Sequence, residues 1–215
     1  MNRRHLLKQL AALAALSSLG AVSYAQRAAG PAFQTLPAKV STEAAGKVEV
    51  IEFFSYGCPH CHDFEPLLND WAKRLAGDVN FIKVPITFNR EQWTVLARAY
   101  YTLEALGEVG KHHGAAFAAL HERRIPLYQE DKLFEWAAGQ GIDRKRFTDA
   151  YKSFGVQSRV QRANQIAAAY KVSGVPLMAV DGRYLVSAST AGGYDQMLKA
   201  VDELIVRARS EKGRG

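Results

Sequence analysis

The chain has two cysteines in 215 residues, Cys58 and Cys61, separated by Pro59 and His60. A disulfide between them would close a ring of only about four residues. Such a short bridge constrains the unfolded chain by about 2 kcal/mol, against about 3 kcal/mol for a 15-residue loop. The pair therefore adds little to stability, and this favours redox chemistry over a structural role.

The reactive form of a cysteine is the thiolate, and an unperturbed thiol with a pKa of about 8.5 is mostly inert at neutral pH. Pro59 suits the first position of a helix because its missing N–H would be unpaired there. Cys58 then takes the N-cap position, where free backbone N–H groups and the helix dipole favour an anion. His60 can add a positive charge or a hydrogen bond. Stabilising the reduced form makes the disulfide oxidising, so we expect an exposed, nucleophilic Cys58 and a less exposed Cys61.

The elements around the pair can be predicted from the apolar pattern. Residues 48–54 are too apolar for a surface strand and predict a central one. A helix is expected from Pro59 to about Ala76, kinked by Pro66. Residues 79–88 predict a second core strand, parallel to the first. A strand that delivers a Cys-x-x-Cys pair to the start of a helix is typical of a thioredoxin-like redox site.

The pattern is helical for about 80 residues after Asn89. One helix carries Trp93, Leu96, Ala97 and Tyr100 on one face, and further helices are expected at 111–122, 131–140, 143–154 and 156–171. Helices without strands over this length predict an inserted helical subdomain over residues 89–171. His112 and His113 are expected on its surface.

Strand patterns return at residues 177–180 and 184–187, joined by Asp181-Gly182, which predicts a two-residue hairpin turn. A last helix begins near Tyr194 and runs beyond Ile205, and the charged end from Arg207 is expected to fray. Residues 33–36 predict a short edge strand. The predicted fold is α/β: a thioredoxin-like mixed sheet flanked by helices, with halves at residues 26–88 and 172–215 around the all-helical insertion.

Residues 1–25 have a positive start, an apolar run of about 13 residues and small residues at the end. This pattern predicts an export signal peptide cleaved after Ala25, and the run is shorter than the ~20 residues of a membrane-spanning helix. The Arg3-Arg4 pair resembles a twin-arginine signal, although ordinary secretory signals can start in the same way. We therefore expect an exported protein.

Cleavage at this position would remove three basic residues and no acid, and would lower the formal net charge from +7 to +4. The remaining chain has no basic block with interleaved aromatic residues, so we do not expect nucleic-acid binding. About 190 residues fit one domain, or one domain with a large insertion.

The run Glu52-Phe-Phe-Ser-Tyr-Gly-Cys-Pro-His-Cys61, followed by Phe64-Glu-Pro-Leu67, resembles the DsbA family of bacterial periplasmic thiol:disulfide oxidases. The resemblance spans nearly all of the mature chain and includes the segment Gly174-Val175-Pro176. It implies a thioredoxin fold with a helical insertion, no cofactor other than the Cys58–Cys61 disulfide, reduced exported proteins as substrates, and re-oxidation by a membrane quinone-linked partner resembling DsbB. We expect a monomer.

Within this resemblance, Cys58 matches the attacked cysteine and Cys61 its buried partner, with Pro59 and His60 as the dipeptide between them. Gly57 departs from family members that carry a bulky aromatic residue at this position. The sequence alone therefore does not predict which side chains make the surroundings of the site hydrophobic.

Two further pairs are implied by the same resemblance. Val175-Pro176 matches a loop with a cis-proline that faces the disulfide and whose preceding residue pairs with substrate through its backbone. Glu52 and Lys83 match charged residues beneath the active site. A glutamate in a central apolar strand needs a partner or a shifted pKa, so the pair is either a proton relay for Cys61 or a partly buried ion pair.

Other readings of the motif remain. Cys58-x-x-Cys61-His62 also satisfies the attachment pattern of a c-type haem, with His62 as an axial ligand, although the preceding strand and Pro59 fit redox thiols better. Zinc is a further possibility, with Cys58, Cys61, His60 and His62 as its ligands. Four ligands packed so tightly suit a tetrahedral ion poorly, so no metal is expected.

A disulfide isomerase or reductase is a nearer alternative, but residues 26–47 are too short for an isomerase's dimerisation domain. A binding or chaperone module with vestigial cysteines is also possible.

Overall fold

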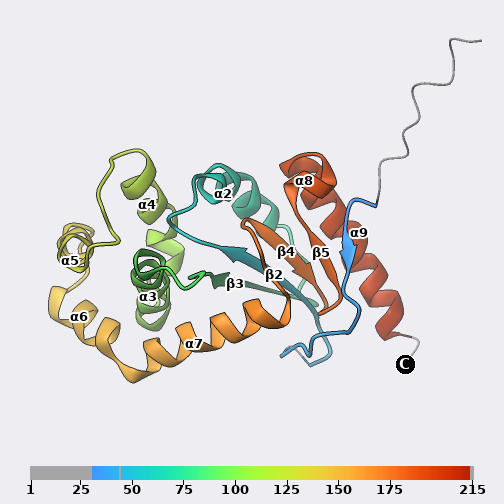
Figure 1. The fold of residues 1–215 in the computed structure, drawn as a ribbon, viewed down its shortest axis with the longest axis horizontal. Coiled ribbons are helices and arrows are strands. Elements are labelled where there is room, and N and C mark those ends of the chain that lie inside the picture. The colour runs from blue at the N-terminus through green and yellow to red at the C-terminus, as the bar shows by residue number, and fades with distance from the viewer. Residues whose placement is uncertain (1–30, 44, 214–215) are drawn as a thin grey trace, which may run out of the picture. The chain divides into compact units, whose positions relative to one another are not determined.

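A five-stranded sheet with the order β1-β5-β4-β2-β3 forms the centre of the fold (Figure 1). The computed structural model describes residues 31–43 and 45–213. The predicted export signal at residues 1–25 lies outside the described residues. The strands are β1 (Gln34–Thr35), β2 (Val48–Phe54), β3 (Val79–Pro85), β4 (Leu177–Val180) and β5 (Tyr184–Val186).

The sheet is mixed, as predicted. Strand β2 pairs with β3 in parallel and with β4 in antiparallel orientation, and all seven of its residues are buried. It is therefore the central strand that its apolar run indicates. Strand β3 ends at Pro85, three residues earlier than expected.

Alternate residues of β2 face two different cores. Val48 and Val50 pack with Phe64 and Leu68 of α2 (Pro59–Ala72) and with α9 (Tyr194–Lys212). Ile51 packs with residues of the helical segment on the other side. Helices thus cover both faces of the sheet, as Figure 1 shows, and α2 is fixed between the sheet and α9.

The segment between β3 and β4 contains only helices. These are α3 (Glu91–Leu106), α4 (Val109–His121), α5 (Glu130–Gly139), α6 (Arg144–Lys152) and α7 (Phe154–Ala169). Each predicted helix is present, with ends that differ by a few residues. The residues from Ala32 onward cluster as one compact unit, so the boundaries of a separate subdomain at 89 and 171 stay a prediction.

The hairpin between β4 and β5 differs from the predicted two-residue turn. Val180 pairs with Tyr184, which leaves a three-residue loop from Asp181 to Arg183. Gly182 has a positive φ of 73°, and a Cβ there would collide with the carbonyl of Val40. The N-terminal segment therefore requires glycine at this position, where the amide of Val40 donates to the carbonyl of Gly182.

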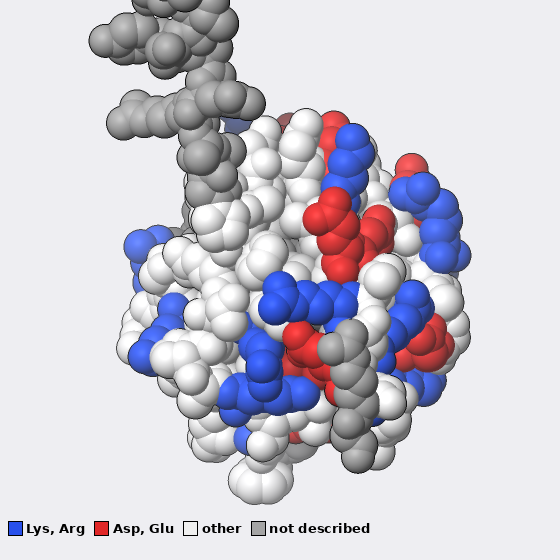
Figure 2. All heavy atoms as spheres, turned by 90° about the vertical axis from the view of Figure 1, so that its right-hand side faces the viewer, with Lys and Arg blue, Asp and Glu red and all other residues white. Residues whose placement is uncertain are grey.

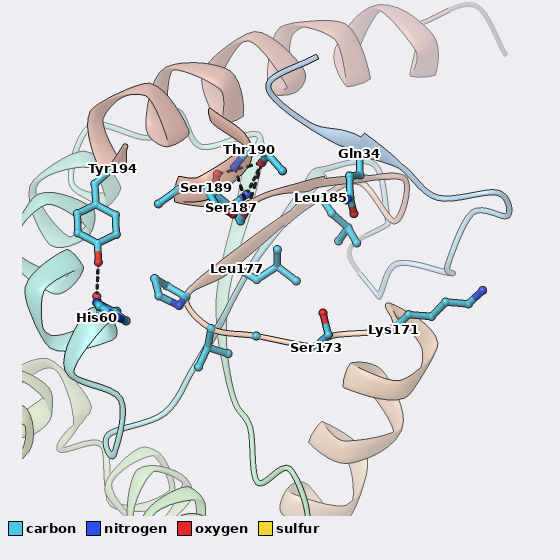
Figure 3. Close-up of a pocket in the computed structure, with 14 residues that line it drawn as sticks. Gln34, His60, Lys171, Ser173, Leu177, Leu185, Ser187, Ser189, Thr190 and Tyr194 are labelled. Carbon is cyan, nitrogen blue, oxygen red and sulfur yellow. Dashed lines mark hydrogen bonds between the residues drawn. The ribbon is translucent and has the colours of Figure 1, made fainter. Parts of the chain in front are cut away.

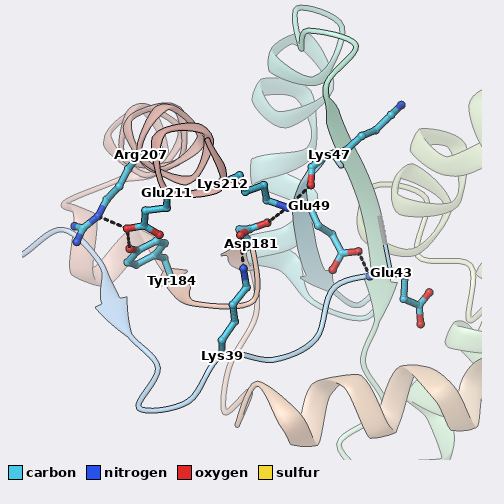
Figure 4. A network of polar contacts seen from close by, with 9 residues as sticks. All are labelled: Lys39, Glu43, Lys47, Glu49, Asp181, Tyr184, Arg207, Glu211 and Lys212. Atoms are coloured by element: carbon cyan, nitrogen blue, oxygen red, sulfur yellow. Dashed lines mark hydrogen bonds and ion pairs between the residues drawn. The ribbon is translucent and has the colours of Figure 1, made fainter. Parts of the chain in front are cut away.

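The charged C-terminal end does not fray at Arg207, because its side chains are paired. Helix α9 continues to Lys212, preceded by the short helix α8 (Ala188–Ala191). Lys212 Nζ lies 2.8 Å from Asp181 Oδ1, and the hydroxyl of Tyr184 donates to Glu211 over 2.7 Å. Figure 4 shows both pairs. The buried Asp181 also accepts from Lys39 at 2.7 Å. These contacts join the N-terminal segment, the hairpin and the last turns of α9.

Basic and acidic side chains lie beside one another over the face that Figure 2 shows, on the α9 side of the molecule. The described residues of this face form no extended surface of one sign. Among the helices in the described part of the chain, none combines the length and apolar character needed to cross a membrane.

Candidate active site

Cys58 is the N-cap residue of α2, with extended backbone angles of φ −99° and ψ 115°, and Pro59 is the first helical residue. This confirms the placement predicted from the sequence. Cys61 lies one turn further on and is fully buried, at 0% exposure, whereas Cys58 is 7% exposed. The prediction that Cys61 is less exposed than Cys58 is therefore confirmed, but Cys58 is not an exposed residue. Its surroundings, including the loop at Val175, cover most of the side chain.

The thiol of Cys58 is surrounded by hydrogen-bond donors. The side chain of Cys61 has the largest effect, and the backbone N–H groups of Cys61 and His60 and the charge of His60 act in the same direction. Together they outweigh burial and lower the pKa of Cys58 to about 6. At neutral pH, Cys58 is therefore mainly a thiolate.

Cys61 has the opposite environment. Burial raises the pKa of its thiol far above the ordinary value, and the hydrogen bond to Cys58 and the nearby charges of Cys58 and Glu52 add to the increase. Cys61 therefore keeps its proton while Cys58 loses its own. The two sulfurs form an asymmetric pair, with one anionic and partly accessible and the other neutral and enclosed.

His60 is exposed on the first turn of α2. The hydroxyl of Tyr194, at the start of α9, donates to the carbonyl of His60 over 3.0 Å. This bond fixes the backbone of the Pro59-His60 dipeptide beside Cys58. His62 faces away, towards α4, where its ring stacks on His121 with 5.1 Å between centroids.

Replacing His60 by leucine should raise the pKa of Cys58 by up to about 1 unit, because a positive charge that favours the thiolate is lost. The backbone N–H groups would remain, so the change is partial, and the disulfide should become less oxidising by up to about 30 mV. A thiolate-absorbance titration measures the first effect. His62→Leu is the matched control on the same helix and should leave the titration unchanged. An identical curve for His60→Leu would show that His60 is a bystander.

The Val175–Pro176 peptide bond is cis, as predicted. Cys58 Sγ lies 3.5 Å from the carbonyl oxygen of Val175. A groove of about 580 Å³ begins here and is lined by His60, the loop before Pro176, and the turn at α8. Figure 3 shows the side chains of Leu177 and Leu185 in the space between Ser173 and the hydrogen-bonded hydroxyls of α8. An apolar floor with polar walls thus adjoins the reactive sulfur.

Glu52 and Lys83 meet directly beneath the pair, because they are opposite one another in the register of β2 and β3. Lys83 Nζ lies 2.7 Å from Glu52 Oε2. It also lies 2.7 Å from Glu65 Oε2 on α2, a contact that was not predicted. Glu52 is fully buried, and burial raises its pKa from 4.5 to about 7 despite Lys83. Glu65 could have been anticipated, since it lies one helical turn after Cys61 on the same face.

His113 is the main correction within the helical segment. The sequence places His112 and His113 on the surface, but they are only 3% and 5% exposed. His113 Nδ1 lies 2.8 Å from the hydroxyl of Tyr56, and its Nε2 lies 3.3 Å from Glu65 Oε2. Both partners come from distant parts of the chain, so no local pattern could have revealed this burial.

Gly57 has its open side covered by α3. A Cβ at this position would lie 3.0 Å from Trp93 Nε1 and 3.2 Å from Leu96 Cδ1. The side chains of Trp93 and Leu96 therefore cover the residue that precedes Cys58. The hydrophobic surroundings that Gly57 itself does not provide come from these two residues of α3, 36 and 39 positions further along the chain.

The haem reading does not fit this geometry. A porphyrin bonded to both sulfurs needs Cys61 at the surface, but Cys61 is fully enclosed in the core.

A thioredoxin-like sheet that presents a Cys-x-x-Cys pair at a helix N-terminus, beside a cis-proline, defines a dithiol–disulfide oxidoreductase. Residues 49–202 match the family described as the DSBA-like thioredoxin domain, and the chain belongs to this family.

Several relatives share the whole length of the fold. The chain is 43% identical over 200 residues to a thiol:disulfide interchange protein DsbA of Bordetella parapertussis, covering 93% of this chain and 94% of that protein. It is 42% identical over 181 residues to the DsbA of Azotobacter vinelandii, covering 84% of each. The crystal structure of Pseudomonas aeruginosa DsbA superposes with a TM-score of 0.82 at 36% identity, covering 86% of this chain and 95% of that one.

Proposed function

We propose that this thiol:disulfide oxidoreductase works as an oxidase in the periplasm, where it donates its Cys58–Cys61 disulfide to reduced, newly exported proteins. The observation that carries the proposal is the asymmetry of the two sulfurs. A thiolate that is stable on Cys58 favours the reduced form, so the protein gives its disulfide away readily. No cofactor other than this disulfide is needed for the exchange.

The reaction begins when a thiolate of the client attacks Cys58, the more accessible sulfur. A mixed disulfide forms, the Cys58–Cys61 bond breaks, and Cys61 leaves with the electron pair and takes up a proton. A second client thiolate then attacks the client sulfur of the mixed disulfide and releases Cys58 as a thiolate. The client dithiol is oxidised by two electrons, and the protein disulfide is reduced by two.

The groove beside Val175 and Pro176 supports a role in client binding. Its apolar floor suits an extended, unfolded segment, and the Val175 carbonyl lies next to the sulfur that would be attacked. Glu52 suits proton transfer to Cys61, because a carboxyl with a pKa of about 7 is partly protonated at neutral pH. A membrane quinone-linked partner resembling DsbB would then re-oxidise Cys58 and Cys61 to the disulfide.

An exchange assay tests the oxidase direction. Oxidised protein is mixed with a reduced, unfolded client containing two cysteines, and thiols and bridges are counted in both proteins by alkylation and mass spectrometry. We expect one client disulfide for each protein disulfide consumed, and none with protein that has been reduced beforehand. A client that keeps both thiols while the protein stays oxidised would refute the proposal. The potential of the pair against glutathione distinguishes an oxidase from a reductase.

A further inference from the structure

Cys58 lies between two peptide groups whose carbonyl oxygens are bonded to side chains from other elements. The carbonyl of His60, two residues after Cys58, accepts a hydrogen bond from the hydroxyl of Tyr194 over 3.0 Å, and Figure 3 shows this contact. The carbonyl of Tyr56, two residues before Cys58, lies 2.7 Å from Nε2 of His121. Tyr194 is the first residue of α9, and His121 is the last residue of α4. One long-range side-chain bond therefore holds the backbone on each side of the reactive residue.

The carbonyl that Tyr194 holds belongs to the same peptide group as the N–H of Cys61. This N–H is hydrogen-bonded to Cys58 and is one of the groups that lower the pKa of its thiol. A hydrogen bond to the oxygen of a peptide group polarises the group and makes its N–H a stronger donor, by about 10–30% per bond. The hydroxyl of Tyr194 therefore acts on the thiolate of Cys58 through this peptide group.

Tyr194 is placed for this bond by the turn that precedes α9. Gly192 and Gly193 have positive φ angles of 92° and 134°, which residues with a side chain rarely adopt. The ring of Tyr194 packs against Phe64 of α2, with 5.1 Å between centroids. Burial raises the pKa of its hydroxyl, and the charge of Asp63 adds to the increase. The hydroxyl therefore keeps its proton and remains a donor.

The carbonyl that His121 holds belongs to the same peptide group as the N–H of Gly57. This N–H donates to Ser55 Oγ over 3.1 Å. Both ends of the peptide group are therefore bonded, and it cannot rotate without breaking a hydrogen bond. The next N–H, that of Cys58, donates to the carbonyl of Ser55 over 3.0 Å. These bonds fix the backbone that leads into the N-cap of α2.

The ring of His121 is suited to hold this carbonyl at any protonation state of the ring. A carbonyl oxygen only accepts, so we assign a proton to Nε2. The neutral Nε2 tautomer and the charged ring both supply it. The ring stacks on His62 at 5.1 Å and on Phe117 at 6.3 Å between centroids. These contacts keep the ring in the plane in which Nε2 reaches Tyr56.

We propose that Tyr194 and His121 are positioning residues that hold the peptide groups on both sides of Cys58 in the orientation that stabilises the thiolate. The inference rests on the proposed function, in which a stable Cys58 thiolate makes the protein give its disulfide away. It adds that the oxidising strength depends on side chains from α4 and α9, outside the helix that carries the two cysteines.

Tyr194→Phe tests the first residue, because it removes one hydroxyl and keeps the ring on Phe64. We expect the pKa of Cys58 in a thiolate-absorbance titration to rise by about 0.3 unit, because the N–H of Cys61 becomes a weaker donor. A less stable thiolate disfavours the reduced form, so the equilibrium with glutathione should shift about twofold towards the oxidised protein. The amide proton of Cys61 in the reduced protein should move upfield in the NMR spectrum.

Tyr184→Phe is the matched control. The hydroxyl of Tyr184 also donates, over 2.7 Å, but to Glu211 in the last turn of α9. Each variant loses one bonded hydroxyl, so urea unfolding of the oxidised proteins should show a similar loss of stability. Only Tyr194→Phe should change the Cys58 titration and the Cys61 amide signal. Titration curves that are the same for both variants would overturn the role of Tyr194.

Two variants of His121 separate its hydrogen bond from its ring. His121→Phe keeps an aromatic ring against His62 but has no N–H, and it should raise the pKa of Cys58 by up to about 0.7 unit, the full effect of one hydrogen bond. His121→Gln loses the ring but offers an amide N–H at a similar distance from the backbone, and it should restore at least half of that shift. A wild-type titration for His121→Phe, or an equal shift in both folded variants, would refute the role of His121.

The outcomes also separate this inference from the proposed function, because the titrations and the glutathione equilibrium involve no client protein. Client bridging by the wild-type protein is measured in the same preparation. If the wild-type protein bridges clients but Tyr194→Phe and His121→Phe, both folded, titrate as the wild type, the positioning roles are wrong and the oxidase assignment stands. If the wild-type protein does not bridge clients, the oxidase assignment itself fails.

Discussion

Replacing Cys58 by serine should abolish disulfide transfer to the limit of detection. A serine hydroxyl forms no disulfide, so the Cys58–Cys61 bond cannot exist and no mixed disulfide with a client can form. Cys61 cannot substitute for it, because this thiol is fully buried and burial raises its pKa far above the ordinary value. The measurement is client bridging followed by alkylation and mass spectrometry, with folding checked by circular dichroism.

Cys61→Ser is the informative partner of that variant. It keeps the Cys58 thiolate at the N-cap of α2 but removes the sulfur that resolves mixed disulfides. We expect it to accumulate a stable mixed disulfide on Cys58 when it is mixed with oxidised glutathione, while Cys58→Ser accumulates none. Full activity of Cys58→Ser would instead favour a binding module in which the cysteines have no function.

The second large effect is on stability: at pH 8, the reduced protein should be more stable than the oxidised protein. The pKa of Cys58 is about 6 in the folded protein, and in the unfolded chain the thiol has its higher, ordinary pKa. A thiol whose pKa is lower in the folded state stabilises that state fully above the unfolded pKa, and the stabilisation is lost as the pH falls through the folded pKa. The stability gap should therefore grow between pH 6 and 9.

The slope of this gap is at most about 1.4 kcal/mol per pH unit, which corresponds to the release of one proton. Solvent near the partly accessible sulfur weakens the pKa shift and so narrows the pH range over which the gap grows. Urea unfolding of both redox forms at each pH measures it. The oxidised form is its own control, because it has no thiol at Cys58 and should lack this pH dependence. If the oxidised protein has a larger free energy of unfolding than the reduced protein at pH 8, the role as a disulfide donor is contradicted.

Predictions that depend on neighbouring residues in the chain were the most successful. Strand Val48–Phe54 has the predicted ends, because an unbroken apolar run marks a strand that is buried on both faces. Pro59 identified the start of α2 and so the position of Cys58. The exposure of Cys58 was not predictable in the same way, since the loop at Val175 that covers it comes from more than 100 residues further along the chain.

Predictions failed where a polar residue finds its partner far along the chain. His113 looks like a surface residue of a helix, and it is buried because Tyr56 and Glu65 reach it. The charged end after Arg207 looks like a fraying terminus. It is ordered by Arg209, which pairs with Asp78, and by Lys212, which pairs with Asp181.

The sequence by itself determined the kind of chemistry, because the two thiols, the helix that begins between them and the anion-favouring N-cap are all set within four consecutive residues. The tertiary structure alone decided how Cys61 is enclosed and which groups surround it. Glu52, Glu65, Lys83 and His113 come from four different elements, and their burial and pairing depend on distances between segments that no local pattern encodes.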